Sequence, residues 1–384
     1  MTEKRVHGGN IKEFCQKQGF VPGQVVDFST NVNFLGPPAN ALAAIGKNLE
    51  SIKYYPDCLQ DELRSVLGEY LALPKENILL GNGSADLIFL LCRYIQPRKA
   101  LIFTPTFSEY GIAVGAVGGE AIHLDMKSQN GFTFPLWKAL TAINDVDLVF
   151  VCNPNNPTGT LLQPKEVLEL VKAAQGKEAI KNHKITTVVD EAFIDFVGPA
   201  NSLRPQAVEL NNLIILGSLT KFFAIPGLRL GYIIADPNTI EELTALRDPW
   251  SINCFAEIAG KEVFKDKHYL SRSIMETRKN RRYLVEQLNL LGGFKPYSSA
   301  ANFILVEISG HELNSHLLQK RLAPYGILIR NCDSFRDLND RYIRLAVRSI
   351  SDIDYLISSI KQTLNFTRNN RIPKPIIKAS HKRS

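Results

Sequence analysis

The sequence lacks several features that mark other classes of protein. None of its six cysteines forms a Cys-x-x-Cys pair, which argues against a structural zinc or iron–sulfur centre, so we predict no metal site. No apolar run approaches ~18 residues and no basic, apolar leader opens the chain, so we expect neither a membrane span nor export. The expected location is the cytoplasm, where the cysteines should remain thiols.

Acidic residues are missing from the end of the chain. The protein has a formal net charge of +7, and residues 366–384 hold six lysines and arginines with no aspartate or glutamate. The rest of the chain therefore carries only +1, which describes a nearly neutral folded body with a basic tail. We interpret this tail as a flexible, solvated end, and the charge distribution does not predict nucleic-acid binding.

Predicted strands alternate with predicted helices through most of the chain. Short apolar runs that are typical of buried strands lie at 78–80, 100–103, 146–151, 185–189 and 213–216. Such alternation predicts an α/β fold with a doubly wound, mostly parallel sheet and a site along the carboxyl edge of its strands.

The last third of the sequence has a different organisation. A long charged helical pattern runs from about residue 256 to 291, and shorter strand patterns follow at 303–306 and 342–347. We therefore predict a large domain followed by a smaller α/β domain. The predicted boundaries are an N-terminal arm that belongs partly to the small domain (1–48), the large domain (49–250), the small domain (251–365) and the tail (366–384).

The most informative stretch is residues 218–232. Lys221 lies where an apolar strand gives way to a loop, beside the hydroxyls of Ser218 and Thr220, and Arg229 stands eight residues further on. A lysine attacks a carbonyl only as the free amine, and burial near other cations lowers its pKa. The hydroxyls and the planar guanidinium suit phosphate oxygens. The stretch therefore predicts a Schiff base between Lys221 and an aldehyde cofactor that carries a phosphate.

Other strand ends supply groups that such a cofactor needs. The glycine-rich turn at 81–86 opens a helix that we predict at 87–94, and the N–H groups at a helix N-terminus bind phosphate. Asp190 ends a buried strand, where a carboxylate can pair with a ring nitrogen and keep it protonated. Phe107 can stack on a flat ring, and the proline-rich loop 153–159 is rigid enough to hold the Asn156 amide against a ligand.

Polar residues near both ends of the chain predict where a substrate binds. Arg330 and Arg344 lie among apolar residues, where an arginine is costly unless a carboxylate or phosphate pairs with it. His7 precedes two glycines that allow close backbone approach, so its ring can face an anion. Residues 29–33 form a polar segment that we interpret as part of the same lining.

With Asn156, Asp190, Lys221 and Arg229 in this order, the chain resembles the fold-type I pyridoxal-phosphate enzymes up to about residue 365. The motifs that carry the resemblance are Asn-Pro-Asn-Asn-Pro-Thr-Gly, Asp-Glu-Ala and Ser-x-Thr-Lys, with an arginine eight residues after the lysine. The resemblance implies pyridoxal 5′-phosphate as cofactor. It also implies that Lys221 bonds to the aldehyde, that Asp190 pairs with the pyridine nitrogen and that Asn156 bonds to the 3′ oxygen.

The same resemblance implies the remaining cofactor contacts. Phe107 would stack on the ring, and Tyr55 would reach the phosphate of the neighbouring subunit's cofactor, so we expect a homodimer with shared sites. The residues implied to hold the phosphate within one subunit are Gly83, Ser84, Ser218, Thr220 and Arg229.

Within this superfamily the chain looks more like the threonine-phosphate decarboxylases than like the histidinol-phosphate aminotransferases. The motifs His-Gly-Gly-Asn, Asp-Phe-Ser-x-Asn-x-Asn and Asp-Glu-Ala-Phe-Ile-Asp-Phe fit the decarboxylases. Position 193 is typically Tyr in the aminotransferases and is Phe here, while Phe34 departs from the Pro that is usual at that position. The residues implied to bind the substrate are His7, Asn31, Asn156, Arg330 and Arg344.

The reaction implied is decarboxylation of L-threonine O-3-phosphate to (R)-1-aminopropan-2-yl phosphate, the linker of the cobalamin nucleotide loop. Two alternatives stay open, a serine-phosphate decarboxylase that gives ethanolamine phosphate and a histidinol-phosphate aminotransferase. A pocket discriminates one methyl group by only ~1–3 kcal/mol, and the geometry that selects the breaking bond is not visible in a sequence. A regulatory module without turnover agrees poorly with an intact set of Lys221, Asp190 and Arg229.

Overall fold

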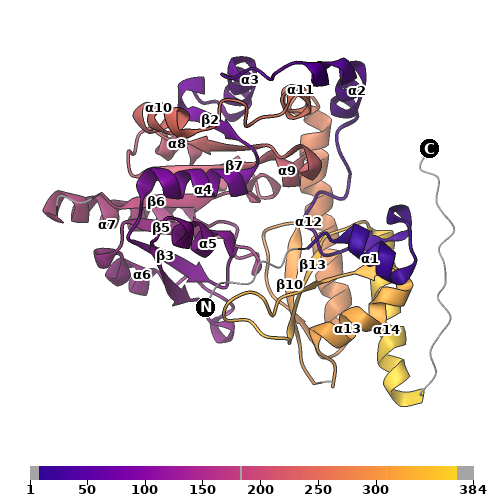
Figure 1. Ribbon diagram of the computed structural model, residues 1–384. Coiled ribbons are helices and arrows are strands. Elements are labelled where there is room, and N and C mark those ends of the chain that lie inside the picture. Colours follow the sequence, from indigo (N-terminus) through magenta and orange to yellow (C-terminus); the bar gives the residue numbers. More distant parts are fainter. Residues whose placement is uncertain (1–7, 182–183, 311, 370–384) are drawn as a thin grey trace.

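The structure is a computed structural model that describes residues 8–181, 184–310 and 312–369. His7 and the basic tail beyond residue 369, both singled out in the sequence, lie outside the described residues. The described chain forms two groups of elements, one around a large sheet and one around a small sheet, joined by the long helix α12 (Lys267–Asn289) (Figure 1). None of the described helices is long and apolar enough to cross a membrane.

The large sheet has seven strands in the order β2-β8-β7-β6-β5-β3-β4. All neighbouring strands are parallel except at β8, which is antiparallel to both of its neighbours. This mostly parallel sheet confirms the predicted fold class. Its strands are β2 (Ile78–Gly81), β3 (Lys99–Thr104), β4 (Glu120–Asp125), β5 (Leu148–Cys152), β6 (Thr186–Asp190), β7 (Leu213–Ser218) and β8 (Gly231–Ile234).

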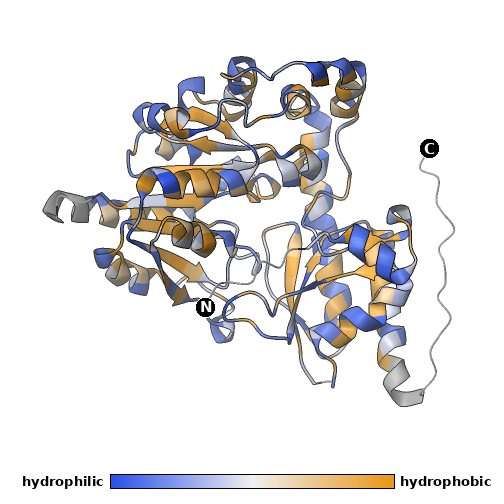
Figure 2. Cartoon of the chain, viewed as in Figure 1, coloured by the Kyte–Doolittle hydropathy of each residue, from blue (hydrophilic) through white to orange (hydrophobic). Residues whose placement is uncertain are grey.

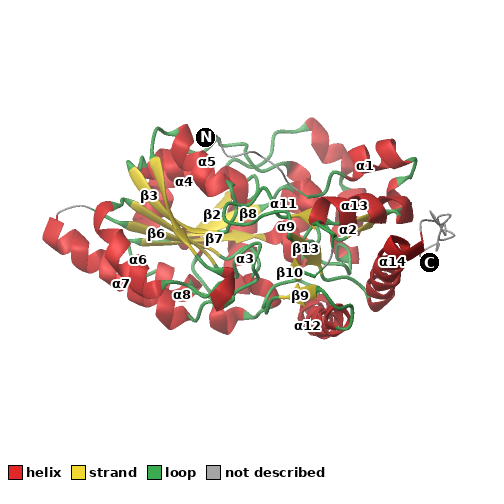
Figure 3. Cartoon of the chain, turned by 90° about the horizontal axis from the view of Figure 1, so that it is seen from below, coloured by secondary structure: helices red, strands yellow, loops and turns green. Residues whose placement is uncertain are grey.

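Helices cover both faces of this sheet (Figure 3). Successive side chains on β6 point to opposite faces, so Val188 joins one apolar cluster and Val189 the other. Burial on both faces explains why the central strands appear in the sequence as continuous apolar runs, and Figure 2 shows these strands as hydrophobic. The covering helices are α4 (Ser84–Ile95), α5 (Glu109–Ala116) and α10 (Pro237–Leu246) on one face and α6 (Leu136–Ala142), α7 (Pro164–Lys181) and α8 (Arg204–Ala207) on the other.

The small sheet is antiparallel, in the order β12-β13-β10-β9. A separate parallel pair joins β1 (Val26–Asp27) to β11 (Ile327–Leu328), which places the N-terminal helix α1 (Ile11–Gln18) beside the C-terminal elements. The predicted domain boundaries themselves stay a prediction. The other elements of this group are β9 (Phe294–Pro296), β10 (Phe303–Ile308), β12 (Arg330–Asn331), β13 (Tyr342–Ala346), α13 (Ser315–Leu322) and α14 (Ile350–Asn369).

The helical pattern predicted from about residue 256 to 291 is interrupted. It divides into α11 (Cys254–Val263) and α12, because Asp266 caps the second helix by accepting a hydrogen bond from the Tyr269 backbone N–H at 2.8 Å. Helix α11 packs with α2 (Ala39–Lys47) and α3 (Asp61–Leu71) beside the large sheet. The short helix α9 (Leu219–Phe222) follows β7 directly and carries Lys221.

Candidate active site

The carboxyl ends of several large-sheet strands meet the small sheet around one cavity of about 490 Å³. This is within the usual range for small-molecule sites, and the carboxyl edge is where ligands bind in open α/β sheets. The structure brings together around this cavity most of the side chains predicted from the sequence. They are Asn31, Ser84, Phe107, Asn156, Asp190, Thr220, Lys221, Arg229, Arg330 and Arg344.

Lys221 lies in the first turn after β7, so its amine projects from the sheet edge into the cavity. Burial, together with the positive charges of Arg229 and Arg344, lowers the pKa of this amine to about 8, against the weaker opposing effect of Asp190. A lysine with this pKa is present in both its amine and ammonium forms near neutral pH. It can therefore act first as a nucleophile and later as a proton donor.

This pKa predicts how cofactor attachment depends on pH. Only the free amine reacts with an aldehyde, so the initial rate at which cofactor-free protein regains its yellow colour with pyridoxal 5′-phosphate should rise about tenfold per pH unit below pH 8. It should level off above about pH 8 rather than near the pKa of an ordinary lysine, ~10.4. Stopped-flow absorbance from pH 6 to 10 measures this profile. A rate that still rose tenfold between pH 9 and 10 would contradict it.

Asp190 ends β6 and both of its carboxylate oxygens are held. Oδ2 accepts a hydrogen bond from the Tyr110 hydroxyl at 2.6 Å, and Oδ1 accepts one from the Ala192 N–H at 2.9 Å. Burial raises the pKa of Asp190, while these two hydrogen bonds act in the opposite direction. A buried carboxylate held in this way is ready to pair with a cationic ring nitrogen, which would supply the missing positive partner.

Tyr110 is a site residue that the sequence analysis missed. It lies in the first turn of α5, three positions after Phe107, and its ring stacks on Phe150 with the centroids 4.8 Å apart. The signal available in the sequence was its place just after Phe107, at the predicted carboxyl end of the same strand. A buried tyrosine hydroxyl needs a partner, and only the tertiary structure shows that this partner is Asp190.

A phosphate cradle closes one end of the cavity. Helix α4 begins at Ser84, directly after Gly83 in a left-handed conformation with φ of 81°. A side chain at position 83 would collide with the Arg229 guanidinium, so the glycine allows the arginine to lie against the helix N-terminus. Thr220 also lines the cavity, and its hydroxyl lies 2.8 Å from the Ser218 hydroxyl. Backbone N–H groups, a guanidinium and hydroxyls are the donors that a phosphate requires.

Two arginines face the cavity from the small sheet. Arg330 on β12 and Arg344 on β13 are partners in the strand register. Arg344 donates to the Asn156 side-chain oxygen at 2.5 Å and to the Ser29 carbonyl at 2.8 Å, so both of its acceptors are neutral. Burial and the nearby charge of Arg330 lower the pKa of Arg344 to about 10. A pair of buried cations in adjacent strands is stabilised by an anionic ligand.

The N-terminal segment supplies another wall. Asp27 accepts hydrogen bonds from the hydroxyls of Ser29 and Thr30, each at 2.6 Å, and this shapes the polar segment that lines the cavity. The side-chain oxygen of Asn31 is buried and has no hydrogen-bond partner among the described residues. It is therefore available to a ligand donor, in agreement with the predicted role of Asn31.

One predicted residue lies away from this cavity within a single chain. The Tyr55 side chain is 83% exposed, and its ring packs against Trp250 with the centroids 5.1 Å apart. We predicted that Tyr55 contacts the cofactor of the neighbouring subunit. Its place outside this chain's own cavity therefore does not test that prediction.

The cavity fits the predicted cofactor in the chemistry of its donors. It offers an amine for an aldehyde, a carboxylate for a ring nitrogen and an aromatic ring, Phe107, for stacking. Asn156 supplies an amide for a ring oxygen, and the cradle around Arg229 supplies donors for a phosphate. These groups come from five separate strand ends, and each matches one part of pyridoxal 5′-phosphate.

Comparison with known proteins agrees with this description. Residues 23–360 match the family described as aminotransferase class I and II. The chain belongs to this family. Aminotransferases of class I and II use pyridoxal 5′-phosphate, so the cofactor predicted from the sequence is confirmed.

Two kinds of relative stand out within the class I and II family. The threonine-phosphate decarboxylase of Salmonella typhimurium is 34% identical over 93% of this chain and 96% of its own length. The crystal structure of the L-threonine-O-3-phosphate decarboxylase of Porphyromonas gingivalis is similar with a TM-score of 0.78 and 25% identity, covering 89% of this chain and 100% of that one. The histidinol-phosphate aminotransferase of Clostridium acetobutylicum gives a TM-score of 0.81 and 31% identity, covering 89% and 99%.

Proposed function

We propose that this protein decarboxylates L-threonine O-3-phosphate to (R)-1-aminopropan-2-yl phosphate, the linker needed for the cobalamin nucleotide loop. The observation that carries the proposal is the pair of cross-strand arginines, Arg330 and Arg344, on the cavity wall that faces Lys221. Arg229 lies in the cradle suited to the cofactor phosphate. Arg330 and Arg344 add two more guanidiniums to the cavity lining, which suits a substrate that carries both a carboxylate and a phosphate. The threonine-phosphate decarboxylase relative, similar over nearly its full length, supports the same substrate.

Phe193 favours decarboxylation over the aminotransferase alternative. Its ring lines the cavity and packs edge-to-face on Phe303 with the centroids 5.0 Å apart. A tyrosine at this position, as is typical of the histidinol-phosphate aminotransferases, would add a hydroxyl beside the cofactor. The phenyl ring of Phe193 has no such hydroxyl, so the Asn156 side chain would bond to the ring oxygen of the cofactor without help from position 193.

The chain's own residues divide the chemical work. When bound, pyridoxal 5′-phosphate supplies a protonated ring that accepts the electrons of the breaking bond. Asp190 keeps the proton on the ring nitrogen, and the arginines hold the substrate so that its carboxylate leaves as CO2. Lys221 then delivers a proton to Cα in place of the lost carboxylate, which its pKa of about 8 permits.

The experiment that tests this function compares three substrates on the purified, cofactor-loaded protein. CO2 release is measured from threonine phosphate and from serine phosphate without any keto acid. Release from threonine phosphate, faster than from serine phosphate, is the expected result. Faster release from serine phosphate would make serine phosphate, rather than threonine phosphate, the proposed substrate. No release from either, with glutamate formed from histidinol phosphate and 2-oxoglutarate, would replace the proposal by an aminotransferase.

We also propose that the enzyme works as a homodimer in the cytoplasm. Exposed apolar side chains gather in and around the segment that carries Tyr55, as is typical of an interface. They are Leu49, Ile52, Tyr54, Leu59 and Trp250. Sedimentation velocity should give the mass of a dimer, and a monomer at micromolar concentration would contradict this part.

The state of the cysteines supports the proposed location in the cytoplasm. All six cysteines, which lie in described residues, are free thiols, as suits a reducing compartment.

A further inference from the structure

The connection from β12 to β13 crosses from the small sheet to the large one. We call its residues 332–338 the strap. Near its far end, the Asp337 carboxylate accepts a hydrogen bond from the Thr104 hydroxyl at 2.5 Å. Thr104 is the last residue of β3 in the large sheet, and Leu338 packs against the apolar cluster of that sheet. The strap is therefore joined to both groups of elements.

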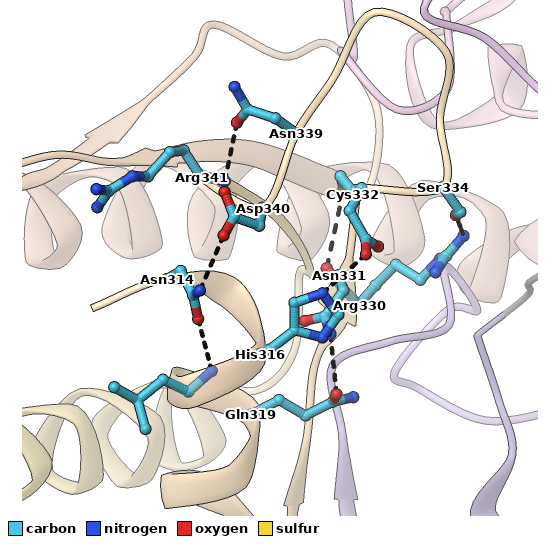
Figure 4. Close-up of polar contacts among 12 residues, drawn as sticks. Asn314, His316, Gln319, Arg330, Asn331, Cys332, Ser334, Asn339, Asp340 and Arg341 are labelled. Atoms are coloured by element: carbon cyan, nitrogen blue, oxygen red, sulfur yellow. Dashed lines mark hydrogen bonds and ion pairs between the residues drawn. The ribbon is translucent and has the colours of Figure 1, made fainter. Parts of the chain in front are cut away.

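The strap holds the guanidinium of Arg330. An Arg330 amino group donates to the Ser334 hydroxyl at 2.7 Å (Figure 4). The guanidinium carbon lies 5.1 Å from the centre of the Phe335 ring. All three residues line the active-site cavity. The strap thus contributes to the position of the positive charge of Arg330 in the cavity that Lys221 also lines.

Arg330 needs such support because of its neighbour. Arg344 stands opposite it on β13, and two like charges in register repel each other. Hydrogen bonding to Ser334 and contact with Phe335 draw the Arg330 guanidinium towards the strap. This support depends in turn on how the strap is attached.

The strap is attached at both ends. At its start, the Asp333 carboxylate lies 2.8 Å from the His316 ring nitrogen Nε2 on α13, which belongs to the small-sheet group. At its end, Thr104 anchors it to the large sheet. The Thr104 carbonyl accepts a hydrogen bond from the Met126 N–H at 2.7 Å, and three residues later the same segment presents Phe107 to the cavity. Thr104 is therefore a fixed point on the side of the cavity that binds the cofactor.

We propose that Thr104 and Asp337 are positioning residues for substrate binding. Their hydrogen bond fastens the strap to the edge of the large sheet. It thereby holds Arg330 where its guanidinium can bind an anionic group of the substrate, either the carboxylate or the phosphate. Asp337 has φ of 67°, a left-handed conformation that aspartate tolerates better than most residues. This inference rests on the proposed function, because it assumes an anionic substrate held by Arg330.

The test replaces the donor and keeps its shape. Thr104→Val removes only the hydroxyl, and Thr104→Ser, which keeps it, is the matched control. Arg330 holds the substrate before and during the reaction, so weaker holding raises KM and leaves kcat unchanged. We expect Thr104→Val to raise the KM for threonine phosphate about tenfold, as for the loss of a charge-assisted hydrogen bond. Thr104→Ser should behave as the wild type. The absorbance of bound cofactor and the Tm should stay unchanged in both variants.

A double-mutant cycle separates this role from a merely structural one. In an Arg330→Gln background, Thr104→Val should have no further effect on KM, because the strap then has no guanidinium to hold. Independent, multiplying effects of the two substitutions would overturn the proposal, as would a wild-type KM in Thr104→Val.

Calorimetric binding of threonine phosphate to proteins that carry Lys221→Ala, in which CO2 release is expected to be about 10³–10⁴-fold slower, provides a readout that does not need turnover. The Kd should rise about tenfold in Thr104→Val and should not rise in Thr104→Ser. Wild-type protein that binds threonine phosphate without releasing CO2 would overturn the proposed function, while the Kd values would still decide the role of the strap. An unchanged Kd in Thr104→Val would overturn the strap proposal alone.

Discussion

Lys221→Ala is expected to lower the rate of CO2 release from threonine phosphate by about 10³–10⁴-fold and to abolish the yellow colour of the bound cofactor. Lys221 is the cavity amine at the end of β7, and its lowered pKa suits both attack on an aldehyde and donation of a proton. Loss of a positioned proton donor alone costs about 10²–10⁴-fold. Loss of covalent attachment adds to this cost, which places the expected loss in the upper half of that range.

The measurement uses absorbance spectra and single-turnover CO2 release on the same preparations. Lys221→Arg is the matched control, since it keeps a positive charge at the site but cannot supply a free amine at any accessible pH. It should be as colourless and as inactive as the alanine variant. More than a tenth of wild-type activity in either variant would show that Lys221 is not the attachment point.

Asp190→Asn is expected to lower CO2 release by about 10²–10³-fold, the usual cost of removing a charged group that stabilises the transition state. The amide has nearly the same shape but carries no negative charge to keep the ring nitrogen protonated. Burial raises the pKa of Asp190, so the ionised carboxylate destabilises the folded protein when the cofactor is absent. The Tm of the cofactor-free variant should therefore equal or exceed that of the wild type at pH 7.

Tyr110→Phe serves as the graded control for this prediction. It keeps the Asp190 charge and removes one of its two hydrogen bonds, so the pKa of Asp190 should rise further. The lower limb of the pH–rate profile should move to higher pH, with a much smaller loss of activity at the optimum. Asp190→Asn with wild-type activity, or Tyr110→Phe with an unshifted profile, would contradict these roles.

The sequence alone identified the part of the site that local rules define. Lys221, Asp190 and Phe107 were predicted because each follows an apolar run that is typical of a buried strand. Parallel strands all present their carboxyl ends at one edge of the sheet. The glycine-rich turn before α4 was predicted from turn chemistry, which also depends on a few adjacent residues, although the helix begins at Ser84 and not at the predicted residue 87. These signals lie within short windows of the chain.

Contacts between distant segments were decided only by the tertiary structure. The arginines were predicted to bind anions, but their opposite positions in β12 and β13 follow from strand register, which no local pattern revealed. The Tyr110–Asp190 bond joins residues 80 positions apart, and the Thr104–Asp337 bond joins residues 233 apart. Strand order and the packing of the small sheet against the large one create these neighbours. Thus the sequence by itself determined the fold class and predicted the groups that would bind the cofactor. The tertiary structure determined which residues position those groups, because positioning depends on contacts between residues that are far apart in the chain.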